Sequence, residues 1–458
     1  MKILFVFPFY KKHIDDHPNL EKDTKGYFWG SSHLPGLGIP ILASLTPSDI
    51  EIEFIDDNYN DINFDMDVSL VAISAFTPQI SRAYQIATEF RKRNVPVVLG
   101  GKHPSIFPEE AIQYADYVMV GEGEGIWQQF IEDFRMNRAK KLYKHDSPID
   151  ITKWKQPNRR IFNFDNYPTK ATHLQIMRGC SIKCETCTIP TYEGTKFRLR
   201  SVQDIVDEVN GLEPEIGRDW WIYIANDELL SRRIPPKYVN ELLDGLASTG
   251  RRYQLSTTLF YLKSYYDYYP DILDRLYRAG IHSLYFVYAV NMSKYNMPED
   301  YIMKLYKWMY SDESVEFIYK LQDKGIDSIL PSVFLGEDFH DKSTFDTVLN
   351  YLDRSKINQA EFTLHTPYPG TLFFKQCQEE KRLLHTDWKY YNSANVVFQP
   401  KHMKPEELLN GFYYCWKEFF KDKSFEKFDL SITNDSFMNG EYSKLRQRKL
   451  RELEGTNQ

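Results

Sequence analysis

The chain has 458 residues, which is enough for two or three domains that each bury a core. Its formal net charge is −7, so no excess of basic residues points to nucleic acid as a partner. Five cysteines in so long a chain do not suggest a secreted disulfide framework, and no apolar run reaches the roughly 18 residues of a membrane span. We therefore expect a cytoplasmic protein without a transmembrane segment.

Residues 1–138 read as alternating strands and helices. Short apolar runs rich in Val and Ile predict buried strands at Lys2–Phe7, Glu51–Ile55, Ser69–Ser74, Val95–Leu99 and Asp116–Val120. An amphipathic stretch such as Ile80–Arg93 predicts a helix between two of these strands. The alternation predicts an α/β, Rossmann-like domain with a doubly wound parallel sheet, whose ligand should bind beyond the carboxyl ends of the strands.

The loops at those strand ends supply the candidate binding residues of the first domain. They are Thr77, Pro78, Gln79 and Ile80 after the third strand, Gly100, Gly101 and His103 after the fourth, and Gly121 and Glu122 after the fifth. Glycine lets backbone approach a large flat ligand closely, although each glycine pair alone is also typical of an ordinary tight turn. As an ordered set, the loops resemble the cobalamin-binding domain of the cobalamin-dependent branch of the radical SAM superfamily, over nearly all of residues 1–135.

This resemblance implies that cobalamin binds to the nine loop residues just named. The Asp-x-His-x-x-Gly motif, with which other cobalamin proteins supply a histidine to cobalt, is absent from the sequence. The resemblance therefore implies a cobalt without a histidine beneath it, with its lower face covered by the loop of residues 77–80. A cobalt without a strong lower ligand is suited to giving its methyl group to a carbon radical.

A polar segment, residues 139–170, has several prolines and no sustained period, so it is predicted to be a linker. Residues 171–370 then alternate again between strands and amphipathic helices. Six strands are predicted, at Thr172–Met177, Trp220–Ala225, Tyr253–Thr258, Ser283–Tyr288, Ser328–Leu335 and Ala360–His365. Six such units match the partial (β/α)6 barrel typical of radical SAM domains, with the active site at the carboxyl ends of the strands.

Cys180, Cys184 and Cys187 form the motif Cys-x3-Cys-x2-Cys directly after the first of these strands. That spacing supplies three thiolates to a four-iron cluster and leaves the fourth iron open for chemistry, whereas electron-transfer clusters and structural zinc sites take four protein ligands. Zinc with a distant fourth ligand, or inert core thiols, are the alternatives. The triplet resembles that of the radical SAM superfamily, in which the open iron binds S-adenosylmethionine (SAM).

Polar and aromatic residues at the other strand ends are candidates for binding SAM. By position in the family they are Asn226 and Asp227 after the second strand, Ser256 and Thr257 at the end of the third, and Ser332 and Phe334 on the fifth. Asn and Asp at such positions are also common as turn or helix caps. The chain departs from many relatives at Thr186, where an aromatic residue often precedes the third cysteine.

The last part of the chain, residues 371–458, is helical in character and resembles the C-terminal region of hopanoid and bacteriochlorophyllide methylases. The resemblance implies a region that faces the substrate. Cys377 and Cys415 stand alone in sequence, so they are expected to be packed core residues. The charged tail, residues 444–458, is expected to fray.

Taken together, the resemblance implies a cobalamin-dependent radical SAM methyltransferase with a 4Fe-4S cluster, SAM and cobalamin as cofactors. It would methylate an unactivated carbon via methylcobalamin and a 5'-deoxyadenosyl radical, with no catalytic side chain beyond the cofactors. The substrate would be a small molecule, a lipid or a peptide, and an external flavodoxin or ferredoxin would donate electrons. The alternatives are an oxidative cyclase or ring-rearranging enzyme with the same cofactors, and a cobalamin or redox sensor.

Overall fold

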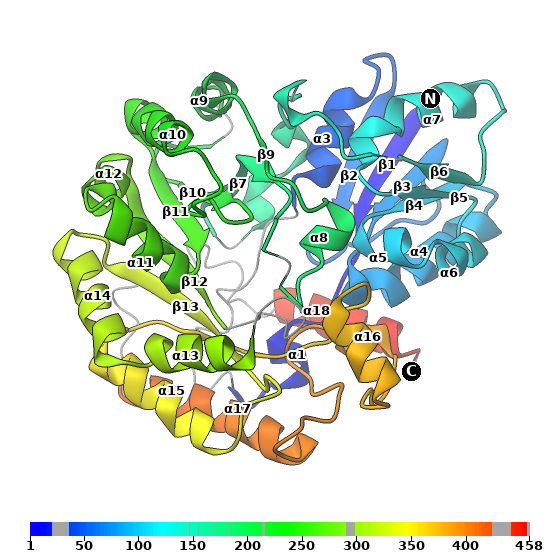
Figure 1. Ribbon diagram of the computed structural model, residues 1–458. Helices are drawn as coiled ribbons and strands as arrows, with labels where there is room; N and C mark the ends of the chain where they lie inside the picture. Colours follow the sequence, from blue (N-terminus) through cyan, green and yellow to red (C-terminus); the bar gives the residue numbers. More distant parts are fainter. Residues whose placement is uncertain are drawn as a thin grey trace.

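The computed structural model describes residues 1–20, 36–145, 147–153, 155–167, 169–182, 184–212, 216–289, 298–423 and 441–455. Within these ranges two six-stranded parallel sheets follow one another along the chain and lie on opposite sides of the molecule (Figure 1). None of the described helices is both long enough and apolar enough to pass through a membrane.

The first sheet has the strand order β2-β1-β3-β4-β5-β6. Its strands are β1 (Lys2–Phe7), β2 (Glu51–Asp56), β3 (Leu70–Ser74), β4 (Val97–Gly100), β5 (Tyr117–Val120) and β6 (Leu142–Lys144). The helices that belong to it are α3 (Gly38–Leu45), α4 (Ile80–Lys92), α5 (Lys102–Ile106), α6 (Pro108–Tyr114) and α7 (Trp127–Arg135). The strand order reverses between β1 and β3, and ligands of doubly wound sheets bind at such a switch point.

The sixth strand, β6, was not predicted. It lies inside residues 139–170, where we expected only a linker, and it pairs in parallel with β5 through Leu142 and Val118. Only Tyr143 of its three residues is buried. A strand of three residues with one buried side chain is too short to show an alternating pattern, which explains why the sequence did not reveal it.

The second sheet is an open half-barrel with the strand order β7-β10-β11-β12-β13-β14. Its strands are β7 (Ala171–Gln175), β10 (Trp221–Ala225), β11 (Arg252–Thr257), β12 (Ile281–Tyr288), β13 (Ser328–Leu335) and β14 (Glu361–Leu364). Its helices are α9 (Val202–Asn210), α10 (Pro236–Thr249), α11 (Leu259–Tyr268), α12 (Ile272–Arg278), α13 (Glu299–Met309), α14 (Asp312–Asp323) and α15 (Ser343–Arg354). The predicted fold class, a doubly wound sheet followed by a partial barrel, is confirmed.

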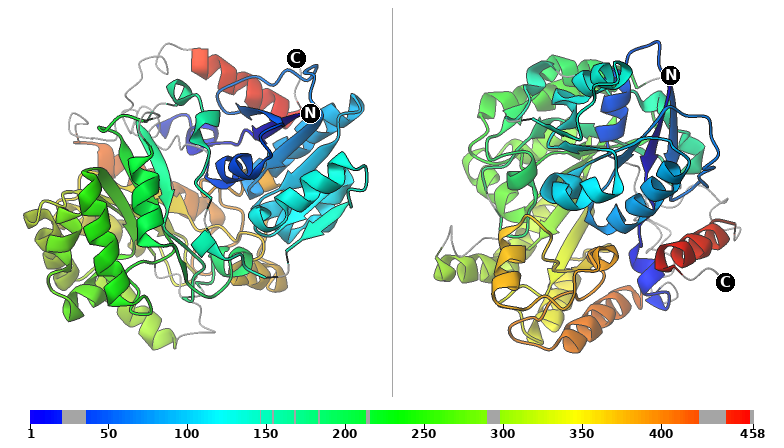
Figure 2. Two further views of the ribbon diagram at one scale, coloured as in Figure 1. Left: turned by 90° about the horizontal axis from the view of Figure 1, so that it is seen from above. Right: turned by 90° about the vertical axis from the view of Figure 1, so that its right-hand side faces the viewer.

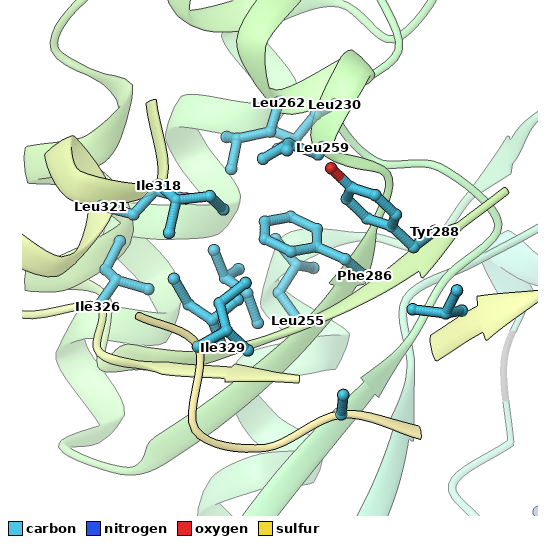
Figure 3. Close-up of a cluster of buried hydrophobic side chains, with 14 of the residues drawn as sticks. Leu230, Leu255, Leu259, Leu262, Phe286, Tyr288, Ile318, Leu321, Ile326 and Ile329 are labelled. Carbon is cyan, nitrogen blue, oxygen red and sulfur yellow. The ribbon is translucent and has the colours of Figure 1, made fainter. Parts of the chain in front are cut away.

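The core of the half-barrel lies between the strands and these helices (Figure 3). Phe286 of β12 is fully buried and packs among Leu259 and Leu262 of α11 and Ile318 of α14. Successive side chains of a strand point to opposite faces, so the next residue, Val287, faces the inner side instead. The strands thus bury one face against helices and present the other to the interior of the half-barrel.

The C-terminal region contains α16 (Leu372–Glu379), α17 (Pro405–Phe420) and α18 (Glu441–Glu454). The expectation of a frayed tail is wrong for α18, which lies beside the first domain (Figure 2). Its Arg446 and Lys449 are buried and form ion pairs with Asp15 and Asp57 of the first domain. Charged side chains, not an apolar stripe, attach this helix, so its charged composition alone suggested a solvated tail.

Candidate active site

Two adjoining cavities open where the carboxyl ends of the two sheets meet. The larger, which we name the cysteine cavity, has a volume of about 720 Å³. Its wall includes Thr77, Pro78 and Gln79 from the first domain and Cys180, Cys184, Cys187, Asp227, Glu228, Phe334 and His365 from the rest of the chain. The smaller, the glycine cavity, has a volume of about 420 Å³ and is lined in part by Gly100, Gly101, Gly121 and Glu122. Both cavities are lined by Phe7, Gly36, Phe76 and Lys102, so the two share a wall.

The three cysteines lie on the loop between two short paired strands, β8 (Met177–Arg178) and β9 (Arg198–Leu199). Gly179 begins this loop with φ +82°, and a Cβ there would lie 2.2 Å from the carbonyl oxygen of Lys196, so only glycine fits. The N–H of Cys180 donates to the carbonyl oxygen of Gly194 (3.1 Å) and closes the loop. Burial raises the pKa of the Cys180 thiol to about 12 and raises those of the other two thiols, so a metal must displace their protons.

The three thiols all line the cysteine cavity. Among the described residues, no group of three His, Cys, Asp or Glu side chains is arranged as the ligands of one metal ion. Cys377 and Cys415 are fully buried in apolar clusters, and neither lines the cavity. They are packed core residues, as we expected.

Two carboxyl groups face the cysteine cavity after β10. Asp227 was a predicted SAM contact, and its Oδ2 has no hydrogen-bond partner in the described part of the chain. Burial raises its pKa above the ordinary range. Glu228, which the sequence analysis missed although it directly follows Asp227, is 3% exposed, and burial raises its pKa to about 7. Thr257 donates to Glu228 from Oγ1 (2.8 Å), and the N–H of Thr258 donates to it at 3.3 Å.

Of the remaining predicted SAM contacts, one lines the cysteine cavity and the others do not. Phe334 lines the cysteine cavity, whereas Ser332, two residues earlier on β13, is buried and is not among the lining residues. Asn226 donates from Nδ2 to the carbonyl oxygen of Ser256 (2.9 Å) and accepts from the N–H of Leu229 (2.8 Å). Thr257 orients Glu228. These polar groups therefore hold the strand ends in place, and Asn226 is a turn residue, which was the alternative reading of its position.

One wall of the glycine cavity is formed by backbone. Gly101 has φ +102°, and a Cβ there would lie 2.6 Å from the carbonyl oxygen of Ala75 at the end of β3. This close approach of β4 to β3 requires glycine, and it leaves the peptide groups of Gly100 and Gly101 on the cavity wall. A wall without side chains admits a large flat ligand close to the backbone.

The loop after β3 forms the turn η2 (Thr77–Gln79) beside the cysteine cavity. Gln79 donates from Nε2 to the carbonyl oxygen of Pro8 (2.8 Å), which ties this turn to the end of β1. Ile80, by contrast, is fully buried in the core of the first domain. His103 is also fully buried, shares hydrogen bonds with Thr77 (3.3 Å) and Glu110 (3.4 Å), and lines neither cavity. The structure thus gives His103 a bracing position beside the turn.

Glu122 joins the two domains. Its carboxylate accepts from Arg178 (2.8 Å), from Arg198 (2.9 Å) and from the N–H of Ile149 (2.9 Å). Arg178, two residues before Cys180, also donates to Glu124 (2.5 Å). Both glutamates belong to the loop after β5, so buried ion pairs fix the cysteine loop against the first domain.

Lys102 and His365 line the cysteine cavity but were not predicted as site residues. Lys102 lies inside the glycine-containing loop that the sequence analysis singled out. Its Nζ lies 6.0 Å from the ring centroid of Phe76 and 5.8 Å from that of Tyr192. His365 ends the sixth predicted strand of the second domain. The place of Lys102 in that loop was a signal that could have found it. His365 belongs to no local sequence motif, and only the fold shows that it lines the cavity.

Known proteins resemble the chain in both domains. Residues 36–131 match the B12 binding domain family. The chain is 26% identical over 407 residues to the bacteriochlorophyllide d C-12(1)-methyltransferase of Chlorobaculum tepidum, covering 87% of this chain and 85% of that protein. It is 24% identical over 443 residues to the hopanoid C-2 methylase of Rhodopseudomonas palustris, covering 90% and 79%. The radical S-adenosylmethionine methyltransferase TsrM of Kitasatospora setae, solved with cobalamin and a 4Fe-4S cluster bound, has the same fold, with a TM-score of 0.63, 14% identity and 99% of each chain covered.

The fold and the cavities therefore define an α/β protein in which a B12-binding domain precedes a half-barrel that carries a three-cysteine loop. Over most of its length this chain is similar to two methylases and shares its fold with a radical S-adenosylmethionine methyltransferase, in agreement with the resemblance found in the sequence. At 26% identity or less, the substrates of these relatives do not carry over to it.

Proposed function

We propose that this chain is a C-methyltransferase that methylates an unactivated carbon of a mostly apolar substrate. The observation that carries this proposal is the shared wall of the two cavities, formed by Phe7, Gly36, Phe76 and Lys102. A radical generated in one cavity and a methyl donor held in the other can then meet the same substrate carbon. Proximity of this kind replaces the acid, base or nucleophile that other methyltransferases use.

The described residues fit the three cofactors. When bound, cobalamin supplies the methyl group, and the 4Fe-4S cluster supplies the electron that cleaves SAM. Cys180, Cys184 and Cys187 hold the cluster. Gly100 and Gly101 present backbone to cobalamin across the glycine cavity.

Side chains around the cysteine cavity orient SAM and keep it close to the cobalamin in the neighbouring cavity. Asp227, with its unpartnered buried oxygen, and Glu228 accept hydrogen bonds from the SAM ammonium group. Phe334 offers an aromatic face for adenine. The turn of residues 77–79 lies at the carboxyl end of the first sheet. It separates the cobalt of the bound cobalamin from the core of that domain. An external flavodoxin or ferredoxin supplies the electron.

The test is a product count under anaerobic conditions. Reconstituted protein is incubated with a reductant, with SAM that carries a deuterated methyl group, and with bacteriochlorophyllide d or a hopanoid, the compound classes named for two relatives. Methyl transfer to carbon consumes two SAM per product. We expect S-adenosylhomocysteine and 5'-deoxyadenosine in about equal amounts, with one deuterated methyl group in the product.

The alternatives give different products. A cyclase or ring-rearranging enzyme would form 5'-deoxyadenosine without S-adenosylhomocysteine, and a sensor would turn over no SAM. Cys184→Ala is the matched control, because it should lose 5'-deoxyadenosine while cobalamin stays bound. Either alternative pattern would overturn the proposal of methyl transfer.

A further inference from the structure

His365 holds an unusual position on the wall of the cysteine cavity. It follows the carboxyl end of β14, is 1% exposed, and stacks on Phe373 with ring centroids 4.3 Å apart and planes 15° from parallel. Neither ring nitrogen makes a hydrogen bond of normal geometry among the residues that the structure describes, although the Gly336 backbone lies near the ring. A buried polar group without a good partner is destabilising, so such an imidazole calls for an explanation.

The imidazole is neutral at physiological pH. Burial is the main cause that lowers the pKa of His365, to about 4. A neutral imidazole presents one N–H donor and one acceptor nitrogen. It therefore matches a neutral polar group. A carboxylate would bring an uncompensated buried charge to this wall, which a neutral ring does not balance.

Two hydroxyl groups lie near His365 on the cavity wall, because the N–H of Leu364, the preceding residue, donates to the carbonyl oxygen of Ser393 (2.7 Å). The Tyr368 hydroxyl and the Ser393 Oγ lie 2.9 Å apart and share one hydrogen bond, and both residues line the cavity. The pair has two hydroxyl protons, and its internal bond uses one of them. His365 and this hydroxyl pair together form what we name the polar corner of the cavity.

The polar corner is tied to the cysteine loop. Phe373, on which His365 stacks, donates its N–H to the carbonyl oxygen of Glu185 (2.9 Å), between the second and third cysteines. Elsewhere the cavity wall carries apolar and aromatic residues such as Phe260, Val287 and Phe334. A ligand group bound at the corner would therefore be held beside the cluster, with the rest of the ligand against apolar side chains.

We propose that the polar corner of His365, Tyr368 and Ser393 is a substrate subsite that binds a neutral hydroxyl or carbonyl group of an otherwise apolar molecule. That the bound molecule is a substrate rests on the proposed function. Binding at the polar corner is independent of that function, because it requires neither SAM cleavage nor cobalamin.

The test uses p-cresol and p-xylene, two small probes of nearly the same shape that differ by a hydroxyl in place of a methyl group. Their affinities are measured by titration calorimetry on the reconstituted holoprotein without SAM. We expect wild type to bind p-cresol about fivefold to tenfold more tightly than p-xylene, the size of one hydrogen bond. His365→Phe should keep the stacking on Phe373 but equalise the two affinities, and His365→Gln should retain part of the preference.

Circular dichroism and iron content show whether each variant is folded and loaded. His385→Gln, a change of an exposed histidine outside the cavity, serves as the matched control and should behave as wild type. Equal affinities in wild type, a preference that survives in His365→Phe, or no binding of either probe would each overturn the subsite. None of these results would affect the product count that tests methyl transfer, so the two proposals fail separately.

Discussion

The glycine cavity and the cysteine cavity share a wall but are built from different parts of the chain. One wall of the first is formed by peptide groups at strand ends, held by the close approach of Gly101 to Ala75, while aromatic and charged side chains such as Trp127 and Arg178 line the rest. The second is lined by thiols, carboxyl groups, an imidazole and aromatic rings. A backbone surface recognises a large ligand by shape, whereas side chains bind metal and charge. Substitutions should therefore act sterically in the first cavity and electrostatically or by ligand loss in the second.

The largest effect is expected from the thiols of the cysteine cavity. Changing Cys180, Cys184 or Cys187 to Ala removes one of the three proposed cluster ligands and should abolish 5'-deoxyadenosine formation. Iron content should fall from about four per chain toward background. Cys377→Ala is the control, because this buried thiol lies in a separate apolar cluster, and it should keep its iron. Full activity in a variant of any of these three cysteines would contradict their assignment as cluster ligands.

The next largest effect is expected from the buried ion pairs that connect the two domains. Arg178→Met leaves the carboxylates of Glu122 and Glu124 without this buried partner and should lower the free energy of unfolding by about 3–5 kcal/mol. Arg135→Met, which breaks an exposed pair with Asp49, should cost about 0–1 kcal/mol. Denaturant unfolding of both variants measures the difference. Equal effects would mean that the two domains are held together by other contacts.

Glycine substitutions test the backbone character of the first cavity. A Cβ at Gly101 meets backbone at 2.6 Å in a conformation that favours glycine, so Gly101→Ala should destabilise the protein by about 1–3 kcal/mol and weaken cobalamin binding. At Gly100 the nearest atom to an added Cβ is Met119 Cβ at 3.7 Å, an ordinary contact. Gly100→Ala should therefore be stable. Thermal unfolding and cobalamin titration, with iron content unchanged, would check both; equal behaviour of the two variants would contradict the steric argument.

The smallest effect is a pH dependence in the second cavity. Burial raises the pKa of Glu228 from 4.5 to about 7, so the folded protein retains a proton that the unfolded chain releases. Stability should therefore decrease as pH rises from about 4.5 to about 7, and SAM, which we propose to bind the charged carboxylate, should bind more tightly over the same interval.

Glu228→Gln should flatten both pH profiles and weaken SAM binding by about tenfold to a hundredfold, the value of a charged hydrogen bond. Glu241→Gln is the control, because this exposed residue lies outside both cavities. An unchanged pH profile in Glu228→Gln would show that another group titrates.

The sequence predicted the features that depend on local patterns and missed those that depend on contacts between distant segments. The parallel strands and the cysteine loop were predictable, because buried runs and ligand spacing are local patterns. The strand ends predicted the glycine wall and Asp227, but not which neighbouring side chains turn inward. Asn226 is held in the turn by Ser256 and Leu229, whereas Glu228 lines the cavity and accepts from Thr257 and Thr258.

The missed features depend on contacts between distant segments. His365 follows β14, an edge strand of the second sheet, and lines a cavity whose other residues come from distant parts of the chain. The helix α18 is attached by ion pairs to acids more than 380 residues earlier. The predicted domain boundaries at 138, 170 and 370 stay predictions, although β6 places part of the first sheet beyond residue 138.

The central claim is that one chain holds a cluster and cobalamin in adjoining cavities. Its most direct test is the cobalt and iron content, with the visible spectrum, after anaerobic reconstitution with iron, sulfide and hydroxocobalamin and removal of free cofactor. The account predicts about one cobalt and about four iron per chain. Four iron without cobalt would contradict it, because the glycine cavity would then serve another ligand.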